Sequence, residues 1–198
     1  MNLERYKGLI FDMDGTLIDT MPAHIEAWRT TAEFFDFPFD GDWLHSMGGM
    51  PSYKIVGEIN RKFGLALEPM AVAEHKMRAF AEIDDSGALI ADTYAVFQDY
   101  LGSKKIAIGT GSQRISAEKL LNRVGVLDKL DAVVTATEVK NHKPHPETFL
   151  RACELIGLQP SECVVFEDTH LGKQAAHAGG MDCIMVTEQG LQFHPLPQ

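Results

Sequence analysis

Five short apolar runs rich in Ile and Val recur along the chain, and none of them alternates between polar and apolar residues. A strand with one face in water alternates in this way, whereas a strand covered on both faces does not. The runs lie at residues 7–11, 105–108, 132–134, 163–166 and 183–186. Between the last four runs lie helical stretches, such as 112–124 and 145–157. This order predicts an α/β fold with a Rossmann-like, doubly wound parallel sheet.

A long segment after the first run breaks this rhythm, because its apolar residues recur at helical spacing and form no strand-like run. Trp28 and Phe80 each lie on one of these helical stretches. We therefore predict a small helical domain at residues 18–86, inserted after the first strand. Residues 1–17 and 87–198 are predicted to form the domain that contains the sheet.

The chain ends in a segment, 189–198, that contains Pro195 and Pro197. Proline fixes φ and removes a backbone donor, so it interrupts regular structure. We predict that this tail is irregular.

The charge of the chain argues against a nucleic-acid partner. Its 198 residues are 45% hydrophobic, enough for a full core, and 28 acidic residues against 18 Lys and Arg give a net charge of -10. A protein that binds nucleic-acid backbones broadly needs a positive charge to attract their phosphates. A small anionic substrate is still compatible, because it responds to the local field of a bound cation and nearby lysines.

The cysteines and the N-terminus favour a cytoplasmic protein. Cys153, Cys163 and Cys183 are odd in number and widely spaced among apolar neighbours, which favours buried free thiols in a reducing compartment. The N-terminal apolar run is too short for a signal peptide or a membrane span, so we expect no membrane partner.

The first acidic motif, Asp12-Met13-Asp14-Gly15-Thr16, directly follows the first apolar run. It therefore lies at the carboxyl end of a strand, where open α/β sheets bind their ligands. Both carboxylates can face the crevice there, and Gly15 permits the tight turn. The alternative is a strand that ends in ordinary turn residues, since Asp and Gly favour turns.

A second acidic pair, Glu167 and Asp168, follows another apolar run. If the strand order reverses between the two runs, both pairs face one crevice. Carboxylates held so close repel one another and raise their pKa values unless a hard cation lies between them, which favours Mg²⁺. The alternative is a pair of helix N-cap acids, which suits Asp168 but explains Glu167 poorly.

Two further positions could bind phosphate. Thr110 ends a strand and is predicted to open a helix, where backbone N–H groups and a hydroxyl can cradle an anion; an ordinary N-cap is the alternative. Lys143 precedes Pro144 in a loop that a second proline, Pro146, also stiffens, and a rigid lysine suits a phosphate clamp. Most loop lysines are merely solvated, so Lys143 carries little weight alone.

Taken in order, the motifs read Asp-x-Asp-Gly-Thr, strand-Thr, Lys-Pro and Glu-Asp-x-x-x-Gly. This ordered set resembles the haloacid dehalogenase superfamily over about residues 7–186. The helical insertion looks like the cap domain of the branch that includes β-phosphoglucomutase and fructose-1-phosphatase-like sugar phosphatases. Thr20, His24 and Trp28 strengthen the likeness to that branch.

The resemblance implies a role for each matching residue. Asp12 would attack phosphorus and form an aspartyl-phosphate, and Asp14 would act as general acid and base. The metal ligands would be Asp12, the Asp14 backbone carbonyl, Glu167 and Asp168, while the phosphate contacts would be Thr110, Gly111, Ser112 and Lys143. In the cap, which would close over the site, His24 would steady Asp14 or touch the substrate; a satisfied helix-surface histidine is the alternative. Lys76 would contact the sugar phosphate, and Gly49 would belong to the specificity loop of the cap.

One position departs from the family's mutases, which carry an Arg in the cap to hold a second phosphate. Aligned on Gly49, this chain has Ser52 there, and only Lys54 offers a substitute. We therefore predict a Mg²⁺-dependent hydrolase of a hexose monophosphate such as fructose 1-phosphate. A sugar-phosphate mutase and a non-catalytic phosphosugar-binding regulator are the alternatives, and a monomer is plausible.

Overall fold

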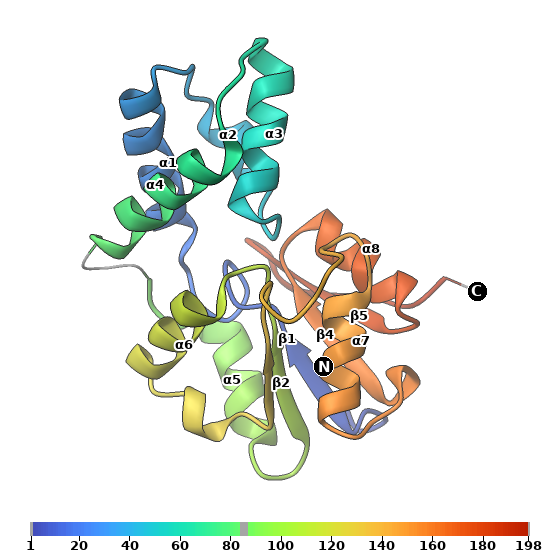
Figure 1. The fold of residues 1–198 in the computed structure, drawn as a ribbon. Coiled ribbons are helices and arrows are strands. Elements are labelled where there is room, and N and C mark those ends of the chain that lie inside the picture. Colours follow the sequence, from blue (N-terminus) through green and yellow to red (C-terminus); the bar gives the residue numbers. More distant parts are fainter. Residues whose placement is uncertain (1, 84–86, 198) are drawn as a thin grey trace.

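The computed structural model describes residues 2–83 and 87–197 (Figure 1). Within them, one sheet has the strand order β3-β2-β1-β4-β5-β6. Its strands are β1 Gly8–Phe11, β2 Lys105–Gly109, β3 Ala132–Val134, β4 Cys163–Glu167, β5 Asp182–Thr187 and β6 Gly190–His194. Strands β1 to β5 pair in parallel and β6 pairs antiparallel with β5. The predicted α/β fold is confirmed.

Helices cover both faces of this sheet, which explains why the strands read as continuous apolar runs. Leu9 and Phe11 of β1 belong to one buried cluster, together with residues of α5 (Ala91–Tyr100) and α6 (Arg114–Arg123). Ile10 points to the other face and shares a cluster with residues of α7 (Glu147–Leu155) and α8 (His170–Ala178). Two short 3-10 helices, η1 Leu127–Lys129 and η2 Pro160–Glu162, precede β3 and β4.

Four helices follow β1 and lie beyond the carboxyl ends of the strands (Figure 1). They are α1 Met21–Phe35, α2 Gly41–His45, α3 Ser52–Phe63 and α4 Pro69–Ala81. They share an apolar cluster of their own, which includes Trp28, Ile55 and Val72. Residues 84–86, where we placed the downstream boundary of the insertion, lie outside the described residues. We call these helices and their connecting loops the cap.

The strand order places three strand ends side by side. β1 lies between β2 and β4, with Phe11 opposite Ile108 on one side and Phe166 on the other. The strand order therefore does reverse between β1 and β4, which is the condition for the two acidic pairs to face one crevice, and this switch point is where open α/β sheets bind ligands. Asp12 is fixed there because its backbone N–H donates to the Phe166 carbonyl at 2.9 Å.

The prediction of an irregular tail was wrong for Gly190–His194, which form β6. Only two residues separate β5 from β6, and Gly190 adopts a positive φ of 97°. Leu191 and Phe193 alternate with polar residues, which is a strand pattern. We gave the later prolines too much weight, although they follow the strand and do not interrupt it.

Other local predictions were imprecise. The helices expected from residues 112 and 145 begin two residues later, at Arg114 and Glu147, with Gln113 and Pro146 at the N-cap positions. Helix α5 was not predicted. The three cysteines are free and buried, as predicted. Among the described residues, no helix combines the length and the apolar character that crossing a bilayer requires.

Candidate active site

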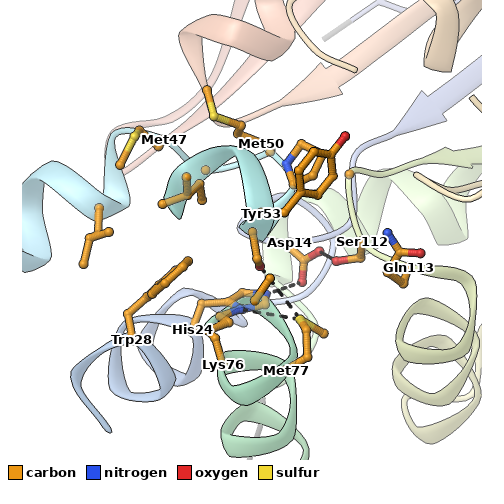
Figure 2. A pocket seen from close by; sticks show the side chains of 18 of the residues that line it. Asp14, His24, Trp28, Met47, Met50, Tyr53, Lys76, Met77, Ser112 and Gln113 are labelled. Atoms are coloured by element: carbon orange, nitrogen blue, oxygen red, sulfur yellow. Dashed lines mark hydrogen bonds and ion pairs between the residues drawn. The ribbon is translucent and has the colours of Figure 1, made fainter. Parts of the chain in front are cut away.

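A cavity of about 460 Å³ lies between the switch point and the cap. Asp12, Asp14 and the 110–113 loop line it from the sheet side. From the cap, helix α1 contributes Met21, His24, Ile25 and Trp28, and helix α4 contributes Met70, Ala73, Glu74, Lys76, Met77 and Arg78. Figure 2 shows several of these side chains converging from separate elements.

Lys143 lies at the base of this site and contacts two carboxylates. Its Nζ donates to Asp12 Oδ1 at 2.5 Å and to Glu167 Oε1 at 2.6 Å. The three residues are only 3%, 2% and 0% exposed, respectively. Burial lowers the pKa of Lys143, but attraction to the two carboxylates outweighs it and holds the pKa above its usual value. The ammonium therefore stays charged.

Glu167 is held by contacts on both of its oxygens. Oε2 accepts hydrogen bonds from the Thr169 N–H at 2.6 Å and its hydroxyl at 2.8 Å. Gly172 of α8 packs against the carboxylate so closely that a Cβ there would lie 1.8 Å from Glu167 Cδ. This close approach gives a physical reason for the glycine of the Glu-Asp-x-x-x-Gly motif. Thr169 is the N-cap of α8, so the alternative N-cap role for Asp168 was wrong.

Asp12, Glu167 and Asp168 form an acidic cluster in which one oxygen from each lies within 4.8 Å of the others. Burial raises the pKa of Asp12 well above its usual value, and the neighbouring carboxylates add to the rise. Burial and the charge of Glu167 raise the pKa of Asp168 to about 7. Lys143 alone does not neutralise three carboxylates, so these oxygen donors suit a hard divalent cation. We call these four residues the acidic floor.

Asp14 accepts hydrogen bonds from four side chains beside the floor. Oδ1 accepts from Thr20 Oγ1 at 2.6 Å and His24 Nε2 at 3.1 Å. Oδ2 accepts from Ser112 Oγ at 2.7 Å and Thr110 Oγ1 at 3.4 Å. Burial raises the pKa of Asp14, but these hydrogen bonds, the one from His24 above all, outweigh it and hold the pKa below its usual value.

His24 connects Asp14 to a buried cap lysine (Figure 2). Lys76 Nζ lies 2.6 Å from His24 Nδ1, and the His24 ring stacks on Phe80 with centroids 4.2 Å apart. Because an ammonium group only donates, Nδ1 accepts and Nε2–H donates to Asp14. Burial and the charge of Lys76 hold the pKa of His24 below its usual value, and burial lowers the pKa of Lys76 to about 8.

The loop after β2 differs from the prediction. Helix α6 begins at Arg114, so Thr110, Gly111 and Ser112 form a loop and not a helix N-terminus. Thr110 Oγ1 accepts from the Ser112 N–H at 3.0 Å. Gly111 lies against the cap loop, where a Cβ would be 2.3 Å from the Gly49 carbonyl oxygen. This glycine allows the cap backbone to reach the loop.

The structure thus brings the predicted site residues of the sheet domain together with His24, Gly49 and Lys76 of the cap. It also adds three threonines that sequence reasoning missed as partners of the carboxylates. Besides Thr20 and Thr169, these include Thr16, whose hydroxyl donates to Asp168 at 3.0 Å. Their only sequence signal was their position next to a motif or a helix start.

Comparison with known proteins places this fold and site in a family. Residues 6–180 match the family described as haloacid dehalogenase-like hydrolases. The chain therefore belongs to the haloacid dehalogenase-like hydrolase family, which confirms the predicted resemblance and the prediction of a hydrolase.

The proteins similar to this chain include two curated relatives and one solved structure. A fructose-1-phosphate phosphatase of Escherichia coli is 40% identical over 183 residues, covering 92% of this chain and 97% of that protein. The β-phosphoglucomutase of Bacillus subtilis is 30% identical over 190 residues, covering 91% and 83%. The crystal structure of β-phosphoglucomutase from Clostridium difficile superposes with a TM-score of 0.83 at 26% identity, covering 92% and 85%.

Proposed function

We propose that this protein is a Mg²⁺-dependent phosphatase that hydrolyses a small sugar phosphate, a hexose monophosphate such as fructose 1-phosphate, through an aspartyl-phosphate on Asp12. The observation that carries the proposal is the buried contact of Asp12 with Lys143, beside two more carboxylates and the hydrogen-bonded Asp14. The similarity to the Escherichia coli fructose-1-phosphate phosphatase supports the substrate class.

The acidic floor provides the metal ligands in this proposal. Asp12, Glu167 and Asp168, with the backbone carbonyl of Asp14, would hold Mg²⁺. When bound, the ion would neutralise the carboxylates and the charge on the phosphoryl oxygens. Lys143 would contact the phosphoryl group beside Asp12, and Glu167 would position Lys143.

Substrate binding would change the state of Asp14. The phosphate would take the hydroxyls of Thr110 and Ser112 and the N–H of Gly111, so Asp14 would lose two donors and gain a negative neighbour. Both changes raise the pKa of a carboxylic acid, which lets Asp14 carry the proton that the leaving sugar oxygen needs. Once the sugar leaves, the ionised Asp14 would deprotonate the water that attacks the aspartyl-phosphate.

Residues 18–86 would act as the cap that closes the cavity and excludes bulk water. Gly49 would be part of the contact with the phosphate loop, and His24 with Lys76 would hold Asp14 in place. A phosphorylated metabolite and a cytoplasmic location are consistent with this function.

Phosphate release from a panel of sugar monophosphates with Mg²⁺ tests the proposal. We expect turnover of at least one hexose monophosphate, and loss of turnover in Asp12→Asn, which keeps the shape of the side chain but cannot attack phosphorus. Wild-type rates no higher than those of Asp12→Asn across the panel would contradict it. Hydrolysis of p-nitrophenyl phosphate that depends on Mg²⁺ would exclude a non-catalytic regulator.

The second candidate is a sugar-phosphate mutase, which the similarity to two β-phosphoglucomutases favours. Ser52 opposes it, because it stands where those mutases are expected to carry Arg, and its hydroxyl faces Met77 Sδ at 3.9 Å. Coupled detection of glucose 6-phosphate formed from β-glucose 1-phosphate separates the two. A mutase gives glucose 6-phosphate with little free phosphate, whereas we expect the reverse.

A further inference from the structure

Arg78 of α4 differs from every other arginine in the chain. It is exposed and lines the cavity, and its guanidinium has no hydrogen-bond or ion-pair partner among residues 2–83 and 87–197. Each of the other arginines donates to a carboxylate or a carbonyl, namely Arg5, Arg29, Arg61, Arg114, Arg123 and Arg151. An unpaired guanidinium at a cavity wall has its donors available for a ligand.

Glu74 lies one helical turn before Arg78 and shares these properties. It also lines the cavity, is exposed and has no partner in the described part of the chain. Residues four apart on a helix are neighbours, yet no ion pair joins Glu74 and Arg78 in the structure. The two side chains therefore place an acceptor and a forked donor next to each other.

The rest of the cap wall offers few polar groups to a sugar. We define the cap wall as the cavity-lining residues of the cap, and it includes five methionines, Met21, Met47, Met50, Met70 and Met77. Of the other polar groups in the wall, Lys76 already contacts His24 and the Ser52 hydroxyl faces Met77, while Tyr53 offers only an uncharged hydroxyl. Glu74 and Arg78 are thus well suited to bind the polar end of a leaving group.

We propose that Glu74 and Arg78 bind two neighbouring hydroxyls of the leaving sugar, away from its phosphate. Each hydroxyl both donates and accepts, so a diol can donate to the carboxylate and accept from the guanidinium. A second phosphate fits this pair poorly, because the Glu74 charge repels an anion. The inference rests on the proposed function and narrows its substrate class to monophosphates of polyhydroxylated leaving groups.

Binding to Asp12→Asn protein tests this inference independently of turnover. Calorimetric titration with fructose 1-phosphate and with inorganic phosphate gives two dissociation constants in the presence of Mg²⁺. Adding Arg78→Ala or Glu74→Ala should weaken fructose 1-phosphate binding about tenfold, because hydrogen bonds to charged groups are lost, and should change phosphate binding at most about twofold. Arg61→Ala is the matched control, since Arg61 is a helical cap arginine paired with Glu58 outside the cavity.

Equal weakening for both ligands, or no weakening for fructose 1-phosphate, would overturn the inference. A third ligand, fructose 1,6-bisphosphate, decides between a diol and a second phosphate. We expect Glu74→Gln to improve the affinity for the bisphosphate relative to fructose 1-phosphate. If Arg78→Ala weakens only the bisphosphate, Arg78 binds phosphate and the inference is wrong. Failure of turnover in the wild type would instead count against the proposed function, because these titrations need none.

Discussion

Two lysines with the same exposure, 3%, lie in opposite electrostatic environments at this site. Lys143 of the acidic floor contacts two carboxylates, and its pKa is held above the usual value. Lys76 of the cap wall contacts a histidine nitrogen, and burial lowers its pKa to about 8. The pKa of a buried lysine therefore depends on its partners as well as on its burial.

The different partners of Lys143 and Lys76 suggest different tasks for the floor and the cap wall. In the floor, oppositely charged side chains of the protein contact one another, which fixes the carboxylates in place before any ligand binds. In the cap wall, Lys76 and Arg78 both lack a carboxylate partner. Lys76 contacts His24 instead, whereas the donors of Arg78 are available to a ligand. We propose that the floor performs the chemistry and that the wall selects the leaving group. The predictions at Lys143, Gly172 and Lys76 each test one of these two regions.

The largest effect is expected from Lys143→Met, which leaves Asp12 and Glu167 buried without their cation. We expect the free energy of unfolding to fall by about 3–5 kcal/mol and kcat/KM to fall by about 1000-fold. Urea denaturation and phosphate release measure the two. Lys105→Met is the control: it breaks the exposed ion pair with Asp131 and should cost about 1 kcal/mol or less. A variant as stable as wild type would show that the floor does not depend on this charge.

Gly172→Ala should have the next largest effect, because the added methyl would displace the Glu167 carboxylate. A displacement of about 1 Å in a positioning group can lower the rate about 100-fold, so we expect a loss of that size in kcat. Gly57→Ala on cap helix α3 is the contrast, since a Cβ there meets nothing within 4 Å. It should stabilise the helix by up to about 1 kcal/mol. Similar effects of both substitutions on kcat would contradict a positioning role for Glu167 in the floor.

Lys76→Met should have opposite effects on stability and activity. The usual lysine pKa of 10.5 falls to about 8 on folding, so the folded state disfavours the charge by about 3 kcal/mol at neutral pH. Removing the charge should stabilise the protein, and the loss of the contact with His24 should reduce this gain to about 1–2 kcal/mol. The same substitution should lower kcat/KM for a sugar phosphate about tenfold.

The lowered pKa of Lys76 also predicts how the stability of the protein changes with pH. Between about pH 8 and 10.5 the unfolded chain binds more protons at Lys76 than the folded one, so wild-type stability should gain from this residue as pH rises. Lys76→Met should lack that gain. Denaturation midpoints measured across this range check it, and identical profiles for the two proteins would contradict it.

The smallest effect is expected at His142, which belongs to neither region. Its Nδ1 is the one buried side-chain nitrogen or oxygen without a partner in the described part of the chain. Burial, and to a smaller extent the positive charge of Lys54, hold the pKa of His142 below its usual value. The unfolded chain therefore takes up a proton at this residue first, so the stability of the wild type should fall as pH drops through about 6.5. His142→Phe should gain about 1 kcal/mol at neutral pH and flatten this dependence. Thermal melting at several pH values tests both expectations.

The sheet was predictable because its signal is local. Leu9, Ile10 and Phe11 are apolar in sequence and buried on both faces of β1, so the run alone indicated a covered strand. Asp12 and Glu167 could be assigned to one edge because they follow such runs. Strand β6 was missed because its alternating pattern is short and prolines follow it.

The contacts within the site were less predictable, because they join distant parts of the chain. Lys143 and Asp12 are 131 positions apart, and nothing in either motif indicates that Glu167 shares the ammonium. The availability of Arg78 could not be predicted either, since it depends on which surface carboxylates lie within reach. Sequence patterns indicated the candidate site residues, whereas three-dimensional packing determines which of them are paired.

The most direct test of the account is to trap the phosphoryl group. Wild-type protein with Mg²⁺ is mixed with fructose 1-phosphate or p-nitrophenyl phosphate, quenched in acid within the first turnover and analysed by peptide mass spectrometry. We predict one added phosphoryl group on Asp12 with both substrates. We also predict that this group is hydrolysed at the same rate in both cases, because the leaving group has already departed and the two aspartyl-phosphates are identical. Phosphorylation of another residue, or turnover without any adduct on Asp12, would contradict the account.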